Sequence, residues 1–216
     1  MVALSKILLI LTLLSLIPGQ LVRIQLAGAA ITMSDISVFA TVSFSTIALV
    51  LSKKSFKINP RILVPAILFS LIALASTVLA LINFAQKDVL TSSLFLIRFL
   101  LYFSLYPITA NLIEAKKAVN WANAYLLIAS VFLFLGFIQI AIFPDLSSLT
   151  VYGWDPHQNR LVSTLLDPNF SGGMLSMTLA LAIGLFLKTQ NKLYLAFSTL
   201  LFIGIIFTFS RSAYLA

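Results

Sequence analysis

Three arginines, Arg98, Arg160 and Arg211, and the one histidine, His157, are the residues of this 216-residue chain best suited to chemistry. A guanidinium group binds phosphate oxygens through two parallel hydrogen bonds and stays charged at every relevant pH. A histidine can act as a base near neutral pH, although a lone histidine in a loop is more often simply solvated. These residue types point to the binding and stabilisation of an anionic, phosphate-bearing group.

The sequence offers no set of residues for a metal ion or a cofactor. It contains no cysteine and a single histidine, and its six Asp and Glu residues are scattered along the chain. Such residues do not form a ligand cluster. No glycine motif that cradles phosphate and no serine–histidine pair has a recognisable spacing. We therefore expect chemistry that uses neither a metal nor a cofactor.

The composition places these candidates in a membrane protein. Hydrophobic residues make up 61 % of the chain and charged residues 9 %, and the mean hydropathy is +1.09. Soluble domains have about 45–50 % apolar and about 25 % charged residues, so soluble enzymes and nucleic-acid-binding modules are excluded. At about 20 residues for each span, we expect an all-α transmembrane bundle of about seven complete spans and the start of an eighth.

The apolar runs set the limits of these spans within a single transmembrane domain over residues 1–216. The second span is expected to begin at the capping pair Ser34 and Asp35. The chain stops inside a further apolar stretch, so we expect it to be the N-terminal part of a longer protein. The expected spans cover residues 7–22, 36–51, 62–82, 89–112, 121–143, 172–187 and 193–209.

The first apolar run has a second interpretation, as a signal peptide cleaved near Ala27-Gly28-Ala29. Arg23, which lies between the apolar run and these small residues, argues against cleavage. Both interpretations place the residues that follow the run outside the cytoplasm.

The distribution of charge predicts the orientation. Of the 14 Lys and Arg residues, nine lie in segments on the same side as the N-terminus, and five of the six acids lie on the other side. Cytoplasmic loops are enriched in Lys and Arg, so we expect a cytoplasmic N-terminus, and the net charge of +8 reflects orientation rather than nucleic-acid binding. The connection 144–171 then becomes a long outer-face loop, and long loops are often functional.

Each arginine has a structural and a functional interpretation. Arg98 lies near the middle of span 89–112, where exposure to lipid costs about 2.5–3.5 kcal/mol, so it should face the bundle interior as a structural group or as a phosphate contact. No acid lies within an expected span, so its partner should not be an intramembrane carboxylate. Arg160 is either solvated or an anion contact. Arg211 lies in a tight re-entry between two spans, which places it against protein or in a cavity.

A short turn follows Arg160 in the outer loop. Asp167-Pro168-Asn169 would form a rigid turn at the start of span 172–187, which would support an anion contact at Arg160. The same spacing also fits a plain helix N-cap at Asp167 or Asn169, and spacing alone favours the cap.

Two polar segments on the outer side form a pattern that is known from one family. Arg160-Leu-Val-Ser-Thr164-Leu-Leu-Asp167-Pro168-Asn169-Phe170 is followed further along the chain by Thr208-Phe-Ser210-Arg211-Ser212-Ala213. In order, spacing and side of the membrane these segments resemble motifs of the O-antigen ligase and O-antigen polymerase family of bacterial membrane proteins. Ser163-Thr164-Leu165 stands where that family usually has Gly-Thr-Phe, and Asp167 replaces the first Asn of its Asn-Pro-Asn.

The resemblance covers the chain from about residue 90 to its end and implies an integral-membrane glycosyltransferase. Such an enzyme moves a glycan from a polyprenyl-diphosphate donor to lipid A–core, as a ligase, or to a growing surface polysaccharide, as a polymerase, at the periplasmic face of the bacterial inner membrane. It implies Arg160 and Arg211 as catalytic residues that stabilise the diphosphate without a metal. With Arg98 and His157, the candidates for substrate binding are Thr164, Asp167, Asn169 and Ser210.

The resemblance also leaves a part of the machinery outside this chain. The family has a large outer loop with a functional His and Arg, and that loop would follow residue 216. His157 does not match its position. We therefore expect the general base to lie beyond residue 216 and the fragment alone to be inactive.

Two other classes of function remain open from the sequence. A transporter or flippase of a lipid-linked or anionic substrate would also use intramembrane arginines, but it should show Gly- or Pro-broken helices paired between repeats, and no such repeat is evident. A structural membrane subunit without chemistry would tolerate substitution freely in its polar outer loop.

Overall fold

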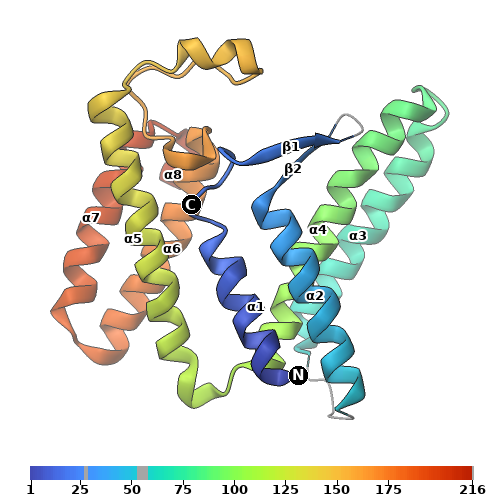
Figure 1. Cartoon of the computed structure of the whole chain (residues 1–216), viewed down its shortest axis with the longest axis horizontal. Helices are drawn as coiled ribbons and strands as arrows, with labels where there is room; N and C mark the ends of the chain where they lie inside the picture. Colours follow the sequence, from blue (N-terminus) through green and yellow to red (C-terminus); the bar gives the residue numbers. More distant parts are fainter. Residues whose placement is uncertain (27–28, 53–57, 216) are drawn as a thin grey trace. The chain divides into compact units, whose positions relative to one another are not determined.

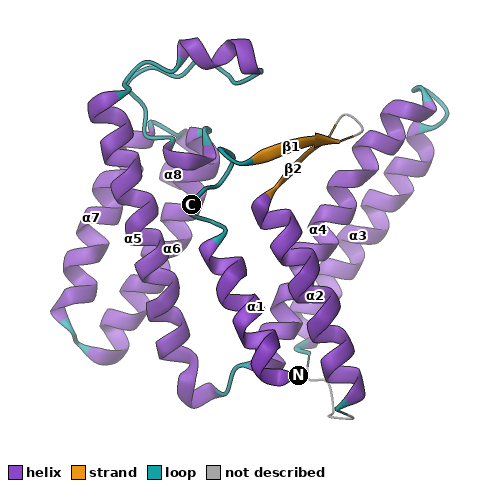
Figure 2. Cartoon of the chain, in the orientation of Figure 1, coloured by secondary structure: helices purple, strands orange, loops and turns teal. Residues whose placement is uncertain are grey.

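The structure is a computed structural model that describes residues 1–26, 29–52 and 58–215, and helices dominate it (Figures 1 and 2). The expected all-α class is confirmed, with one small antiparallel hairpin of strands β1 (Arg23–Leu26) and β2 (Ala29–Thr32) added to it. The helices are α1 (Val2–Leu14), α2 (Met33–Leu51), α3 (Pro60–Ala80), α4 (Gln86–Leu112), α5 (Ala118–Ile142), α6 (Pro168–Thr189), α7 (Lys192–Thr208) and α8 (Arg211–Leu215), with short 3₁₀ turns η1 (Ala115–Lys117), η2 (Ser147–Tyr152) and η3 (Ser163–Leu165).

Some residues used in the sequence analysis lie outside the described part of the chain. They are Ala27 and Gly28 of the cleavage site considered above, and Lys53, Lys54 and Lys57, on which the expected orientation partly depends.

Among the described residues, five helices are long and apolar enough to cross a membrane: α2, α3, α4, α5 together with η1, and α6. Helices α1 and α7 are also apolar but have only 13 and 17 residues. A span needs about 20 residues. Helix α1 is shorter than the expected span 7–22, whereas α7 is as long as the expected span 193–209. The chain is thus a helical protein with several helices suited to a multi-pass membrane arrangement.

The chain divides into two compact units, which are described separately. Unit 1 comprises Met1–Ser15 and Arg23–Ala115, and unit 2 comprises Leu16–Val22 and Lys116–Ala216. This division is finer than the single transmembrane domain expected from the sequence.

In unit 1, helices α1 and α2 meet through hydroxyl side chains. The Thr12 and Thr41 hydroxyl oxygens lie 2.7 Å apart, and the Ser37 hydroxyl donates to the Ser15 hydroxyl over 2.8 Å. Ser34 also donates to the Ser15 carbonyl. Small polar residues let membrane helices approach closely and bond to one another where lipid gives no hydrophobic drive for association.

Replacing Thr12 and Thr41 with valine, singly and together, tests this contact. We expect a coupling free energy of about 0.6 kcal/mol between the two sites, the average for hydroxyl bonds between membrane helices. Thermal unfolding in detergent micelles measures it. Thr77→Val is the matched control, because the Thr77 hydroxyl bonds only to the Ala73 carbonyl of its own helix.

Arg98 in α4 forms an ion pair with Asp35 in α2, a candidate membrane-spanning helix, which corrects the expectation that its partner would not be an intramembrane carboxylate. The Arg98 Nη2 atom lies 2.9 Å from Asp35 Oδ2 and also donates to the Ala30 carbonyl of β2. The expectation was wrong because α2 begins at Met33, ahead of the apolar run, with Thr32 rather than Ser34 as its N-cap. Asp35 therefore belongs to the first turn of the helix.

Asp35 is fully engaged by its neighbours. Its Oδ2 atom accepts hydrogen bonds from the Thr32 amide over 2.8 Å and from the Thr32 hydroxyl over 2.9 Å, and its Oδ1 atom accepts one from the Tyr102 hydroxyl over 3.1 Å. Thr32 and Asp35 form a capping box at the start of α2. We call Thr32, Asp35, Arg98 and Tyr102 the Asp35 clamp, and it ties α2, the hairpin and α4 together. For Arg98 this favours the structural interpretation.

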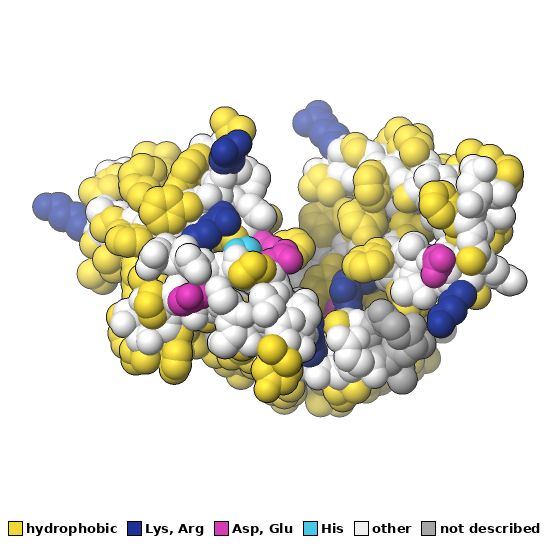
Figure 3. All heavy atoms as spheres, turned by 90° about the horizontal axis from the view of Figure 1, so that it is seen from above, with side chains coloured by type: hydrophobic (Ala, Val, Ile, Leu, Met, Phe, Trp, Pro, Cys, Tyr) yellow, Lys and Arg dark blue, Asp and Glu magenta, His cyan; other side chains and the backbone are white. Residues whose placement is uncertain are grey.

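Helix α3 packs on its neighbour without burying any of its residues. It runs beside α4 in Figure 1, and the rings of Phe69 and Phe99 pack with their centroids 4.9 Å apart. Its apolar side chains, such as Ile72 and Leu79, are 70 % and 62 % exposed, as expected of a surface that contacts lipid. Hydrophobic atoms also cover much of the surface visible in Figure 3.

Unit 2 is built around α5, α6 and α7. Phe132 of α5, Leu175 of α6 and Leu201 of α7 are completely buried and form the centre of one apolar cluster. Gly204 permits this packing, because a Cβ atom there would lie 2.4 Å from a methyl carbon of Leu133.

The predicted extension of the first span to residue 22 was wrong. Helix α1 ends at Leu14, and Leu16–Val22 forms a turn that belongs to unit 2. Gly19 adopts a φ of +51°, and the Gln20 amide donates to the Thr164 carbonyl over 2.8 Å. Pro18 lacks an amide hydrogen and Gly19 favours the left-handed region, so the helix stops although the sequence stays apolar.

Candidate functional site

The segment that contains Arg160 is held between three helices of unit 2. The Leu161 amide donates to the Phe207 carbonyl at the end of α7 over 2.8 Å, and the Val162 amide donates to the side-chain oxygen of Gln139 in α5 over 3.0 Å. The Ser171 hydroxyl of α6 donates to the Val162 carbonyl. Leu161 and Val162 are completely buried. Hydrogen bonds to α5, α6 and α7 therefore hold both the amide groups and a carbonyl group of this segment.

Arg160 closes the C-terminal end of α7. Its Nε atom donates to the Thr208 carbonyl over 2.9 Å and its Nη2 atom donates to the Phe209 carbonyl over 2.8 Å. The last carbonyls of a helix have no partner within the helix and carry partial negative charge, so a guanidinium stabilises them. In the described part of the chain, Nη1 has no hydrogen-bond partner. Arg160 is thus a positioning group for the α7–α8 turn that keeps one nitrogen free.

The turn between α7 and α8 joins the two polar segments of the sequence. The Ser210 hydroxyl donates to Asn169 Oδ1 over 2.7 Å and lies 2.9 Å from the Ser212 hydroxyl. Ser210 itself is almost fully buried, at 1 % exposure, whereas Asn169 is exposed. The start of α6 and the start of α8 are therefore linked by side chains, although they are 41 residues apart.

Close backbone packing fixes the same junction. A Cβ atom on Gly172 of α6 would lie 2.5 Å from the Cβ of Ala213 in α8, 3.3 Å from the Thr208 hydroxyl and 3.5 Å from the Ser210 Cβ. The Ser176 hydroxyl, one turn further along α6, donates to the Ala213 carbonyl over 3.2 Å. Helix α8 therefore lies directly against α6, and only glycine fits at position 172.

Arg211 is the first residue of α8 and is exposed. A tight turn is present at this point, because α7 ends at Thr208 and α8 begins at Arg211, but the described part of α8 has only five residues and does not form a second span. The expected burial against protein is absent, because α8 turns Ala213 toward α6 and leaves the arginine outside. Its guanidinium bonds to no other described residue.

Asp167 and Thr164 have structural roles. Asp167 is the N-cap of α6, as spacing alone favoured, and its Oδ1 atom accepts hydrogen bonds from the Asn169 and Phe170 amides over 2.7 and 3.0 Å. Thr164 lies in η3 and is 6 % exposed beneath the turn at Gly19. Its hydroxyl is buried and has no hydrogen-bond partner among the described residues.

His157 lies in the loop between α5 and α6. The next residue, Gln158, pairs with Asp145 at the start of this loop in an isolated antiparallel β-bridge. The Leu146 amide donates to the His157 carbonyl over 2.9 Å, and the Gln158 side chain donates to Asp145 over 3.3 Å. Hydrogen bonds from Ser147 hold the pKa of Asp145 below its ordinary value. His157 Nε2 is buried and finds no partner in the described chain.

Backbone strain gathers around this junction. Four of the five described non-glycine residues with positive φ, namely Asn159, Ser163, Leu166 and Phe209, flank the segment of Arg160 or the α7–α8 turn. Such conformations cost about 1–3 kcal/mol each and persist where the surroundings impose them, which is frequent at functional sites.

The structure thus brings Arg160, Asn169, Ser210 and Arg211 to one junction, which we call the α6–α8 junction. Arg98 belongs to the clamp of unit 1, and Thr164 is buried within η3. Sequence reasoning missed Gln139, Ser171 and Gly172. Gln139 gave a usable signal, because an amide within an apolar helix needs a partner. Ser171 and Gly172 gave none, because small residues in membrane helices are common.

The described residues contain no group of three His, Cys, Asp or Glu side chains that could hold a metal ion. Exposed donors at the α6–α8 junction instead suit an anion: the Arg211 guanidinium, the free Arg160 nitrogen and the Asn169 amide group. Comparison of the chain with family models, curated proteins and solved structures finds no match.

Proposed function

We propose that this chain is part of a bacterial inner-membrane glycosyltransferase that transfers a glycan from a polyprenyl-diphosphate donor. The acceptor is lipid A–core in a ligase or a growing polysaccharide in a polymerase. In the reaction, the bond between the anomeric carbon of the sugar and a diphosphate oxygen breaks. A hydroxyl oxygen of the acceptor bonds to that carbon, and its proton passes to a general base.

The hydrogen bond between Ser210 and Asn169 carries the proposal. It joins the two segments that resemble the motifs of the ligase and polymerase family, and it places Arg211 next to the start of α6. The leaving diphosphate gains negative charge as the glycosidic bond breaks. Cationic donors beside the leaving group stabilise such charge without a metal.

Arg160 and Arg211 have different roles in this proposal. Arg211 is exposed and free to contact the diphosphate directly. Arg160 acts mainly through the turn, because two of its nitrogens already bond to the Thr208 and Phe209 carbonyls.

Arg211→Ala in the full-length protein is expected to lower glycan transfer by about 100-fold or more, the effect of removing one donor to a developing oxyanion. The measurement is the amount of surface polysaccharide that the variant restores in cells lacking their own copy. Protein level and thermal stability should stay unchanged, because Arg211 bonds to no described residue of its own chain.

Arg61→Ala is the matched control, since Arg61 is also exposed but lies in the first turns of α3 in unit 1. It should transfer normally. Transfer at the wild-type level by Arg211→Ala would contradict the proposed function.

A further inference from the structure

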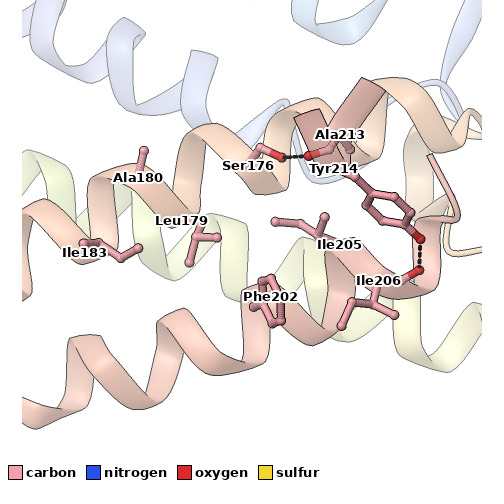
Figure 4. Close-up of a pocket in the computed structure, with 9 residues that line it drawn as sticks. All are labelled: Ser176, Leu179, Ala180, Ile183, Phe202, Ile205, Ile206, Ala213 and Tyr214. Atoms are coloured by element: carbon pink, nitrogen blue, oxygen red, sulfur yellow. Dashed lines mark hydrogen bonds between the residues drawn. The ribbon is translucent and has the colours of Figure 1, made fainter. Parts of the chain in front are cut away.

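The loop between α5 and α6 exposes two large apolar side chains at its far end. Val151 and Tyr152 of η2 are 85 % and 70 % exposed. Apolar side chains on the helices themselves, such as those of α6 and α7 in Figure 4, are what a membrane helix presents to lipid tails. Val151 and Tyr152 lie beyond the end of α5, in a loop, so their exposure indicates a contact of its own.

Backbone hydrogen bonds between its two arms give this loop a defined shape. The Leu146 amide donates to the His157 carbonyl over 2.9 Å, and the Asn159 amide donates to the Pro144 carbonyl over 2.7 Å. The arms therefore run side by side, and the far end of the loop has a fixed place relative to the end of α5.

The loop also has a small apolar cluster of its own. Leu149 and Trp154 pack against Leu146, Val162 and Leu166, which are buried. The side chains exposed on η2 lie outside this cluster. The far end of the loop thus has one apolar side that stabilises it and a second that has no use within the described part of unit 2.

The helices on either side of the loop place it at a membrane surface. Both α5 and α6 are long and apolar enough to cross a membrane. Phe143, directly after α5, and Phe170, in the first turn of α6, are 63 % and 67 % exposed. Exposed aromatic rings at the ends of spans are typical of the boundary between lipid and water.

The direction of the loop keeps its far end near this boundary. In Figure 1 the yellow-orange segment after α5 runs sideways from the end of the helix, instead of continuing along the helix axis. A segment that leaves a span in this direction follows the membrane surface and does not project far into water. The side chains exposed on η2 are therefore within reach of the lipid head-group region.

The side chains of this segment suit that region. Residues 146–154 include no charged side chain, and Asp145 and Asp155 flank them. Tyrosine and tryptophan are enriched at membrane–water interfaces, because one part of each ring system is apolar and another forms hydrogen bonds with water. Residues 144–159 contain no Lys or Arg, so attraction to anionic lipids plays no part.

We propose that η2 anchors the loop to the membrane surface, with Val151 and Tyr152 inserted into the interfacial layer of the bilayer. The partner is the lipid surface itself, and the contact is apolar rather than electrostatic. The segment of Arg160 is then held between two supports, the lipid at the far end of the loop and α5, α6 and α7 at its base. This inference needs no part of the proposed function.

The test is the depth of a nitroxide spin label in the full-length protein, reconstituted into phosphatidylcholine nanodiscs. Residues 1–216 contain no cysteine, so Val151→Cys gives one attachment site once any cysteine beyond them has been replaced. Oxygen concentrates in lipid and a nickel chelate in water, so the ratio of their effects on the relaxation of the label measures depth. The ratio for Val151→Cys should be several-fold higher than for Asp155→Cys, an exposed position in the same loop. Ile72→Cys on the exposed side of α3 supplies the reference for a label in lipid.

A second set of variants tests the two side chains themselves. The label is moved to Ser148→Cys, an exposed position that lies one turn of the 3₁₀ helix before Val151. Adding Val151→Glu and Tyr152→Glu should lower the ratio several-fold, because the new carboxylates favour water over the interface. Adding Val151→Leu and Tyr152→Phe instead keeps the apolar surface and should leave the ratio unchanged.

Three results would overturn the anchor. If the nickel chelate reaches position 151 as readily as position 155, the far end of the loop lies in water. If neither reagent reaches position 151, protein covers it, either from the same chain or from a second copy. If the two glutamates leave the ratio unchanged, lipid contact does not depend on these side chains. Adding phosphatidylglycerol to the nanodiscs should not alter the ratio, and a marked rise would contradict a contact that is apolar.

Discussion

Replacing Asp35 with alanine is expected to lower the unfolding free energy by about 3 kcal/mol. The substitution removes the capping box of α2, which contributes about 1 kcal/mol. It also leaves the Arg98 guanidinium without its carboxylate. Breaking a buried ion pair costs about 3–5 kcal/mol, but the side chain of Arg98 is 38 % exposed, so only part of that penalty applies.

Thermal or chemical unfolding in detergent micelles measures this effect. Asp88→Ala is the matched control, because Asp88 also lies in the first turn of a helix but is exposed, and its loss should change stability by less than about 0.5 kcal/mol. The double variant Asp35→Ala with Arg98→Leu should recover part of the loss, because the unpaired cation is gone. Equal stability of Asp35→Ala and Asp88→Ala would show that the Asp35 clamp does not stabilise the unit.

Gly172→Ala is expected to lower the unfolding free energy by about 1–3 kcal/mol, the usual effect of overpacking. The new methyl group would meet the Ala213 Cβ at 2.5 Å, and neither side chain can rotate away. Helix α8 must therefore move from α6, and Arg211 moves with it. If the proposed function holds, a displacement of about 1 Å would lower transfer by about 100-fold.

The neighbouring glycine gives an unusually close control. A Cβ atom on Gly173 would meet nothing within 4 Å, so Gly173→Ala should leave the protein as stable or slightly more stable. Gly172→Ala combined with Ala213→Gly should regain most of the loss, because the opposing methyl group is removed. A Gly172→Ala variant that matches Gly173→Ala in both stability and transfer would contradict the close packing of α6 and α8.

Much of the helical architecture could be predicted from apolar run length alone. The limits of α3, α4 and α5 agree with the expected spans to within a few residues, because Pro60 and the charged segment near Lys116 interrupt the pattern clearly. The N-cap at Asp167 was predictable too, since a carboxylate before proline at the first helical position satisfies free amides.

The contacts of the arginines could not be predicted. Arg98 meets Asp35 because α2 starts one turn earlier than its apolar run, and helix starts are set by capping groups that leave little trace in hydropathy. Arg160 bonds to carbonyls at the end of α7, 48 residues further along the chain, and backbone acceptors have no signature in a sequence. The same holds for Gly172, whose importance depends on a partner helix.

The ion pair between α2 and α4 also bears on how the protein is made. A ribosome synthesises α2 before α4, so the helix that contains Asp35 precedes the segment that contains Arg98. An arginine in the middle of an isolated helix resists entry into a bilayer by about 2.5–3.5 kcal/mol. Pairing with Asp35 of the earlier helix therefore offsets part of the cost of placing Arg98 in the membrane.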